Sequence, residues 1–275
     1  FARSIAAVVA VGDRPALIAA LVGRALTLPV SPPEAVRIAG NKLMTRNRLR
    51  EADLPCPWFH SLPLDVSQLS RIDDIKFPCV LKPLTLTASR GVMRVDNTVD
   101  LEQAVTRLRR LLKFQDVRAL RDPANDALLV EEYISGHEVA VEGVMTDGAL
   151  QVFATFDKPD PLEGPFFEET IYVTPANLLE FRERHVIRQL EFAVTAVGLI
   201  NGPVHAELRL NERGVFVLEI AARPIGGLCA RVLRFDGPMG TALSLEDILL
   251  RHALRQRVQS FGRAKPGAGV MMIPI

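Results

Sequence analysis

One hairpin pattern reads Pro203-Val-His-Ala-Glu-Leu-Arg-Leu210, then Asn-Glu-Arg-Gly214, then Val215-Phe-Val-Leu-Glu-Ile-Ala-Ala-Arg-Pro224. Apolar and polar residues alternate along both arms, as they do in half-buried strands, and a short turn that ends in glycine joins the arms. The predicted buried face carries Val204, Ala206, Leu208 and Leu210 from the first arm and Phe216, Leu218 and Ile220 from the second. We therefore expect an antiparallel hairpin with one face on a core.

The opposite face of this hairpin carries two glutamates, Glu207 and Glu219. If the loop between the arms has an odd number of residues, the two carboxylates lie side by side across the ladder. Adjacent carboxylates repel each other, and a divalent cation that also binds phosphates is the usual reason for such a pair. A solvated face with mixed charges is the alternative.

The composition narrows the class of protein. With 275 residues, 48% hydrophobic and 24% charged, the chain is long enough for two lobes around substantial cores. Its net charge of +1 gives no electrostatic case for nucleic acid or an acidic membrane as a partner. No apolar run approaches the ~18 residues of a membrane helix, and no signal peptide precedes the first strand pattern. The scattered Cys56, Cys79 and Cys229 match no metal-binding spacing and favour reduced thiols in the cytoplasm.

Local patterns predict the remaining elements. Helices are expected over residues 15–25, 33–52, 98–113 and 177–197, and strands over residues 5–11, 77–83, 91–95, 128–134, 138–145 and 149–156. Gly198 ends the last of these helices, and Ser244 with Asp247 indicates the start of another. Arg24, Arg37, Arg46, Arg48 and Arg50 are expected on a solvated helix face. Helices mixed with antiparallel hairpins make the fold class α+β.

Lys82 and a neighbouring loop are candidates for phosphate binding. Lys82 ends the apolar strand Cys79-Val-Leu-Lys-Pro83, and a lysine that leaves a buried strand needs a polar partner such as a phosphate. A rim lysine that reaches solvent is the alternative. The loop Thr85-Leu-Thr-Ala-Ser-Arg-Gly-Val92 can turn backbone N–H groups toward an anion, although a plain surface turn fits it equally. Lys42 by itself is typical of a solvated helix lysine.

A second strand end offers a nucleotide site. Glu131-Glu-Tyr-Ile134 is followed closely by Gly136 and Glu138. A strand edge can present backbone N–H and C=O groups to an adenine, and a nearby carboxylate can accept two ribose hydroxyls.

Arg223 follows Glu219 on the same face of the hairpin, before Gly226 and Gly227. An arginine beside a metal pair can stabilise the charge on a transferred phosphoryl group or an oxyanion, and glycines let the backbone approach a ligand closely. Neutralisation of Glu219 is the alternative.

One proline-bounded apolar stretch carries Glu168, Glu169 and Tyr172, which either line a pocket or sit on a strand. No nucleophile motif is present, and the histidines form no zinc pattern.

Taken together and in this order, these segments resemble the ATP-grasp superfamily, and within it the carboxylate–amine ligase branch that includes bacterial L-amino-acid ligases. The resemblance covers about residues 30–275. Its most specific parts are Gly202-Pro-Val-His-Ala-Glu-Leu208 and Leu218-Glu-Ile-Ala-Ala-Arg-Pro-Ile-Gly-Gly227, followed by the run at residues 131–138.

The resemblance implies two α+β lobes that clamp ATP, preceded by the tail of an α/β pre-ATP-grasp domain. We expect residues 1–32 to be that tail, residues 33–133 the first lobe and residues 134–275 the second lobe with the metal and catalytic site. Because the chain opens on Phe1 and stops at Ile275 within a strand pattern, we also expect a fragment of a longer protein.

The resemblance also implies roles for single residues. ATP would be bound by Lys42, Lys82, Ser89, Arg90, Gly91, Val92, Glu131, Glu132, Tyr133, Ile134 and Glu138. Mg²⁺ or Mn²⁺ would be held by Glu207 and Glu219, and Arg223 would steady the acyl phosphate and the tetrahedral intermediate. The substrates would meet Glu169, Tyr172, His205, Gly226 and Gly227, with Glu169 near an amino group.

The implied function is an ADP-forming ligase in the cytoplasm that activates a small carboxylate as an acyl phosphate and joins it to an amine. Its partners would be small molecules, and a homodimer is one alternative for its assembly. Three departures from the family pattern stand out: Ala221 replaces a frequent metal-binding Asn, the phosphate loop has few glycines, and Ile171-Tyr172 replaces a frequent Gly-His. The rivals are a carboxylase or a formate or ribonucleotide-type ATP-grasp enzyme, and a non-catalytic ATP-binding protein.

Overall fold

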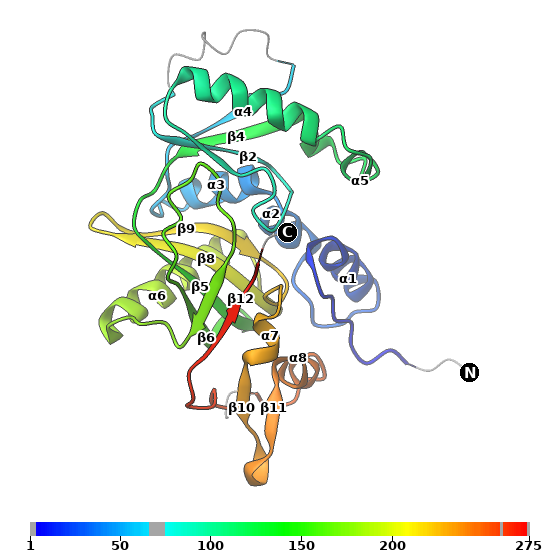
Figure 1. Cartoon of the computed structure of the whole chain (residues 1–275). Coiled ribbons are helices and arrows are strands. Elements are labelled where there is room, and N and C mark those ends of the chain that lie inside the picture. The colour runs from blue at the N-terminus through cyan, green and yellow to red at the C-terminus, as the bar shows by residue number, and fades with distance from the viewer. Residues whose placement is uncertain (1–3, 66–74, 259–260, 274–275) are drawn as a thin grey trace.

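Two antiparallel sheets with associated helices make up the computed structural model, which describes residues 4–65, 75–258 and 261–273 (Figure 1). The main helices are α1 (Asp13–Ala25), α2 (Pro33–Ala39), α3 (Lys42–Glu51), α4 (Thr98–Leu111), α5 (Gln115–Arg118), α6 (Glu180–Val197), α7 (Cys229–Val232) and α8 (Leu245–Ala253). The strands are β1 (Phe59–Pro63), β2 (Cys79–Pro83), β3 (Met93–Val95), β4 (Ala127–Glu132), β5 (His137–Thr146), β6 (Ala149–Lys158), β7 (Ile171–Thr174), β8 (Gly202–Asn211), β9 (Gly214–Ala221), β10 (Arg234–Asp236), β11 (Ala242–Ser244) and β12 (Ala268–Met271).

The smaller main sheet has the strand order β1-β4-β2-β3. One of its faces packs on α4, whose Leu101, Val105 and Leu108 are buried at helical spacing. Since side chains alternate between the faces of a strand, Lys82 of β2 and Glu131 of β4 lie on the face away from α4.

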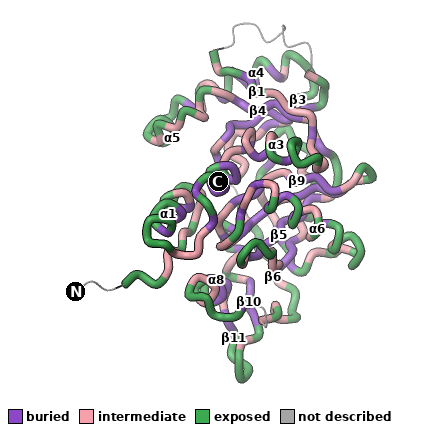
Figure 2. Tube along the Cα trace, turned by 180° about the vertical axis from the view of Figure 1, so that it is seen from behind, coloured by how far each residue is buried: buried purple, intermediate pink, exposed green. Residues whose placement is uncertain are grey.

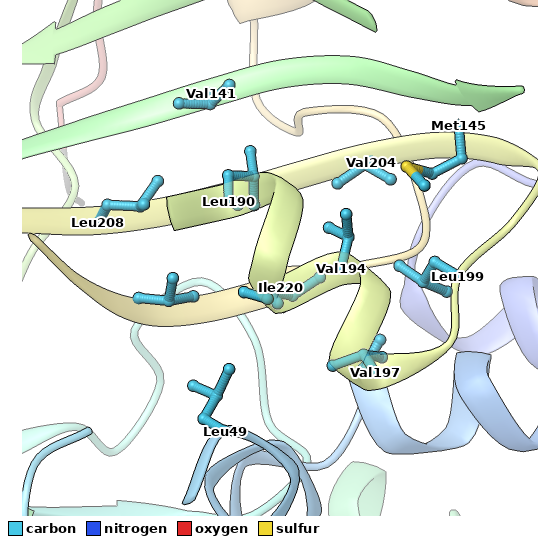
Figure 3. Close-up of a cluster of buried hydrophobic side chains, with 14 of the residues drawn as sticks. Leu49, Val141, Met145, Leu190, Val194, Val197, Leu199, Val204, Leu208 and Ile220 are labelled. Atoms are coloured by element: carbon cyan, nitrogen blue, oxygen red, sulfur yellow. The ribbon is translucent and has the colours of Figure 1, made fainter. Parts of the chain in front are cut away.

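The larger sheet has the order β12-β7-β6-β5-β8-β9. One face forms the main core with α6, where Leu190 and Val194 pack over Val204 and Ile220 (Figure 3). Gly198 ends α6 in the left-handed conformation, as the sequence predicts. Figure 2 shows buried residues concentrated in the strands of both sheets, while the outer surfaces of α1 and α6 are exposed.

The other face of the larger sheet is divided. At one end α7, α8 and the β10–β11 hairpin close a second apolar cluster, which contains Ala140 and Val144 of β5. At the other end, β5, β8 and β9 face the smaller sheet across a cavity, with Glu138, Glu207 and Glu219 among its lining residues. The fold therefore places the polar face of each sheet toward the other.

The β8–β9 hairpin pairs Glu207 directly with Glu219, as predicted, but the odd residue is not in the turn. Asn211 pairs with Gly214, and the extra residue is Leu218, in a bulge between the Glu207 and Leu208 pairs. The predicted core face of the second arm is therefore wrong at Phe216 and Leu218 and confirmed at Ile220. Since the bulge shifts the alternation, Val215, Val217 and Ile220 join the main core, and Leu218 lines the cavity.

Two further predictions are corrected. The helix expected over residues 33–52 is broken into α2 and α3, because Asn41 caps a new helix by accepting a hydrogen bond from the N–H of Met44 at 3.1 Å. Residues 5–11 form no strand in the described structure; a strand needs a neighbour for its backbone groups, and none of the described strands pairs there. No helix within the described ranges is long and apolar enough to cross a bilayer.

Candidate active site

A cavity of about 310 Å³ lies between the two sheets and gathers most of the residues singled out from the sequence. It is lined by Lys42, Lys82, Ser89, Val92, Glu131, Glu132, Tyr133, Ile134, Glu138, Glu169, Tyr172, His205, Glu207, Glu219, Arg223, Gly226 and Gly227. Arg90 and Gly91 lie outside it. The sequence patterns thus converge on one site, although the segments are far apart along the chain.

The two carboxylates at its centre are each in contact with a buried lysine. Lys158 Nζ lies 3.1 Å from Glu207 Oε1, and Lys42 Nζ lies 3.2 Å from Glu219 Oε2. Burial raises the pKa of Glu207, but Lys158 and then His205 outweigh it and hold this pKa at about 2. The cations around Glu207 therefore stabilise the charged form of its carboxylate.

The donor set of this pair fits Mg²⁺. Among the described residues no group of three His, Cys, Asp or Glu side chains is arranged to hold a metal ion. Mg²⁺ is commonly bound through one or two carboxylates together with phosphate oxygens and water, whereas structural zinc requires four protein ligands. Glu207 and Glu219 are therefore the residues that would hold a magnesium ion.

Lys158 is a central residue that the sequence analysis missed. It ends β6, is 6% exposed, and donates to Glu138 Oε1 at 2.5 Å as well as to Glu207. Although burial lowers its pKa, Glu207 and Glu138 raise the pKa of Lys158 well above its ordinary value. A signal was present, since Lys158 precedes a proline at the end of a strand just as Lys82 does.

Arg46 was also misassigned, because it is wholly buried rather than on a solvated face. Its guanidinium donates to both carboxylate oxygens of Glu131, at 2.7 and 3.2 Å, and to the carbonyl oxygens of Val217 and Leu218 in β9. Lys82 Nζ lies 2.5 Å from the same Glu131 carboxylate. The Glu131 carboxylate is therefore engaged in holding Lys82, and the backbone beyond it is what remains to meet a base.

Aromatic and guanidinium groups form the wall beside residues 132–134. The ring of Tyr133 stacks with Phe167 at a centroid distance of 6.3 Å and lies beneath the guanidinium groups of Arg94 and Arg209. Arg209 also donates to Glu138 Oε2 at 2.7 Å. Both oxygens of Glu138 thus have cationic partners.

The loop after β2 contributes Ser89 and Val92 to the cavity but turns Arg90 outward, where it pairs with Asp116 at 2.5 Å. Gly91 has a φ of +82°, and a Cβ there would lie 2.7 Å from Leu111. Gly91 is therefore required for close packing on α4, which explains why it does not face the cavity.

Arg223 has an unexpected partner. Its Nε lies 2.9 Å from the Asp13 carboxylate at the start of α1, although the sequence analysis considered only Glu219. Burial lowers the pKa of Arg223, but Asp13 and then Glu219 raise it above its ordinary value. Arg223 is thus held at the cavity by an ion pair with the N-terminal part of the chain.

Glu169 and Tyr172 line the cavity beside Glu207. Burial, and then repulsion by Glu207, raises the pKa of Glu169, and the Tyr172 hydroxyl donates to Glu207 Oε1 at 3.3 Å. Within the described chain no ion pair is found for Glu169, whose carboxyl interacts with Tyr172 as well as with Glu207.

A comparison with protein families matches residues 75–232 to the ATP-grasp domain, a range that includes the Glu207/Glu219 pair and strands of both main sheets. The chain belongs to the ATP-grasp family. The fold class and the family expected from the sequence are thereby confirmed.

Three proteins similar to this ATP-grasp chain narrow the group within the family to which it can be compared. Carnosine synthase 1 of Homo sapiens is 26% identical over 262 residues, covering 90% of this chain and 31% of the relative. Alanine–anticapsin ligase of Bacillus subtilis (strain 168) is 28% identical over 169 residues, covering 56% and 35%. The crystal structure of an L-amino acid ligase from Bacillus licheniformis superposes with a TM-score of 0.78 at 28% identity, covering 96% of this chain and 62% of that one. The chain spans about a third of the length of these curated relatives.

Proposed function

We propose that this ATP-grasp chain forms the nucleotide and metal site of an ATP-dependent, ADP-forming ligase that joins a small carboxylate to an amine. The observation that carries the proposal is the adjacent pair Glu207 and Glu219, which lines one cavity together with the buried Lys42 and Lys82. Lys158, also buried, contacts Glu207 from the same sheet. The names of the relatives, each an amino-acid ligase or a synthase, support this choice of reaction.

In the proposed reaction Lys42, Lys82 and Lys158 bind the phosphates of ATP, exchanging carboxylate partners for phosphate oxygens. Mg²⁺, when held by Glu207 and Glu219, supplies positive charge against the phosphate oxygens. A substrate carboxylate attacks the γ-phosphorus and gives an acyl phosphate and ADP; an amine then displaces phosphate and forms the amide. Arg223 offsets the negative charge of the acyl phosphate and of the tetrahedral intermediate.

Enclosure between the two sheets serves this chemistry, because an acyl phosphate hydrolyses when water reaches it. We propose that the protein acts in the cytoplasm, which is consistent with three unpaired cysteines in the structure. A carboxylase or formate-type reaction is disfavoured by Ala221 at the position of a frequent metal-binding Asn.

The test is ADP release by the full-length protein with Mg·ATP across pairs of amino acids and other small carboxylates. We expect one pair to stimulate release. Stimulation by bicarbonate or formate alone would favour the carboxylase-type rival, and tight ATP binding without turnover on any substrate would favour a binding protein.

A substitution at Glu219 tests the proposed metal-binding role separately. Glu219→Gln should abolish ADP release, by at least about 10²-fold, because the neutral amide binds Mg²⁺ poorly. Glu212→Gln, in the exposed turn of the same hairpin, is the matched control and should be fully active. Unchanged turnover in Glu219→Gln would refute the metal role.

A further inference from the structure

Glu142 is a buried carboxyl group to which the proposed reaction gives no role. It lies on β5 with no exposed surface, on the strand face that carries Glu138, and between Ala140 and Val144 of the second apolar cluster. It is not among the residues that line the cavity. Burial raises the pKa of Glu142, so an ionisable side chain at this position is costly.

The contacts of Glu142 point toward the cavity wall. Its Oε2 accepts a hydrogen bond from the backbone N–H of Ile225 at 3.0 Å and lies 3.5 Å from Nδ1 of His205, the residue opposite it on β8. Its Oε1 and His205 Nδ1 have no hydrogen-bond partner in the described chain. Both residues that it reaches, Ile225 and His205, line the cavity.

Ile225 belongs to the segment of residues 223–227 that follows β9 and brings Arg223, Gly226 and Gly227 to the cavity. Neither glycine N–H has a hydrogen-bond partner among the described residues, and a Cβ at Gly226 would meet nothing within 4 Å. Among the described residues, the backbone of residues 224–227 makes one hydrogen bond to the larger sheet, and this is the bond from Ile225 to Glu142. A single buried carboxylate oxygen therefore anchors a segment of main chain that has no other hydrogen bond to this sheet among the described residues.

We propose that Glu142 is a positioning residue for the acyl-transfer half of the site, holding the main chain at Ile225 so that Arg223 and the two glycines meet the carboxylate substrate. This inference rests on the proposed ligase function. A positioning role explains why a carboxyl group stands at the edge of an apolar cluster. Misplacement of a reacting partner by about 1 Å lowers the rate on the order of 10²-fold, so an anchor for this segment matters for the reaction.

The experiment compares Glu142→Leu, Glu142→Gln and the control Val144→Ala in the full-length protein. Gln keeps an acceptor oxygen for Ile225, whereas Leu does not. Val144 is wholly buried on the same strand face and in the same apolar cluster, so Val144→Ala reports a loss of packing without a polar contact. The readouts are kcat and KM for the carboxylate, the Kd of a non-hydrolysable ATP analogue, and hydrogen exchange of the Ile225 amide resolved by fragmentation mass spectrometry.

For Glu142→Leu we expect at least about tenfold faster exchange at Ile225 and at least about tenfold lower kcat, with the nucleotide Kd within about twofold of wild type. Glu142→Gln should show the wild-type exchange at Ile225 and the wild-type kcat, and Val144→Ala should change neither the exchange nor kcat. Unchanged exchange in Glu142→Leu, or faster exchange with unchanged kcat, would overturn the proposal. So would a Gln variant as impaired as the Leu variant. If the wild-type protein releases no ADP with any carboxylate, the ligase function fails, and the exchange of Ile225 alone decides whether Glu142 holds this segment.

Discussion

Lys42, Lys82 and Lys158 are each at most 7% exposed, and each has a carboxylate within 3.2 Å. Breaking a buried ion pair by removing one partner costs about 3–5 kcal/mol, because the remaining charge is left without compensation. The carboxylates therefore compensate the charge of the lysines and orient them, and in the proposed reaction phosphate oxygens replace the carboxylates. At the scale of single residues, the site is preorganised by ion pairs rather than by solvent.

Glu131 should make stability depend on acid pH. Burial raises its pKa, but Arg46 and Lys82 outweigh burial and lower it from 4.5 to about 2. The folded state thus binds this proton more weakly than the unfolded state. The resulting stabilisation, about 3 kcal/mol, is complete above about pH 4.5 and is lost as the pH falls to about 2.

Urea unfolding across this pH range tests the prediction. Glu131→Gln should lower the free energy of unfolding at neutral pH and flatten its dependence between pH 4.5 and 2. Glu132→Gln, which removes the neighbouring carboxylate that pairs with Arg213 at the surface, should keep the wild-type slope. Equal slopes for the wild type and Glu131→Gln would contradict the assignment.

Arg223→Ala should reduce kcat by about 10²-fold and leave nucleotide affinity unchanged, because in the proposed reaction its charge acts on the acyl phosphate rather than on ATP. Steady-state kinetics together with nucleotide titration measure the two effects separately. Arg231→Ala, an exposed arginine on α7, is the control. A large loss of ATP binding in Arg223→Ala would instead assign the guanidinium to the nucleotide.

At the scale of elements, irregular positions in the strands determine which side chains reach the cavity. The bulge at Leu218 sets Glu219 opposite Glu207, and a second irregularity in the β5–β6 pairing leaves Phe153 of β6 as the extra residue opposite Glu142 and Gly143. A bulge re-aims the side chains around it at the cost of local pairing. Both irregularities therefore lie at or next to the proposed site.

Gly136, in the connection between β4 and β5, lies too close to a neighbouring strand to carry a side chain. Gly136 has a φ of +125°, and a Cβ there would lie 2.2 Å from the carbonyl oxygen of Leu210. Gly136→Ala should lower the free energy of unfolding by about 3 kcal/mol or more, from backbone strain and collision together. Gly214→Ala, with a φ of +133° and no atom within 4 Å, isolates the strain and should cost about 1 kcal/mol. If the two variants lose the same free energy of unfolding in urea, the collision at Gly136 is relieved without an energetic cost.

At the scale of the whole molecule, Arg46 joins the two sheets. It links Glu131 of the smaller sheet with the carbonyl groups of Val217 and Leu218, which directly precede Glu219 in β9. This wholly buried guanidinium therefore helps to fix Lys82, which pairs with Glu131, relative to Glu219.

Arg46→Lys should lower the free energy of unfolding by about 3 kcal/mol or more, since an ammonium cannot make the bidentate contact and reach both carbonyl groups. Arg48→Lys changes an exposed arginine of the same helix that pairs with Glu51 and should shift stability by less than about 0.5 kcal/mol. Denaturant unfolding of the two variants is the measurement. A small effect at Arg46 would mean that the sheets are held together by apolar packing alone.

The sequence by itself determined the α+β class, the family, the hairpin that carries Glu207 and Glu219, and most helices and strands. These depend on the spacing of residues a few positions apart, which backbone geometry converts into faces of helices and strands. It also indicated residues that line the cavity, some because they end strands, as Lys82 does, and others, such as Lys42, only through the resemblance to the family.

Only the tertiary structure decided which charges meet. Arg46 and Glu131 are 85 residues apart, Glu142 and Ile225 are 83 apart, and Arg223 and Asp13 are 210 apart. Local periodicity predicted Arg46 on a solvated face and said nothing of Lys158, because burial of a charge depends on a partner brought by another element. The bulge at Leu218 escaped prediction for the same reason, since its register is set by packing against the main core and not by the alternation of its own strand.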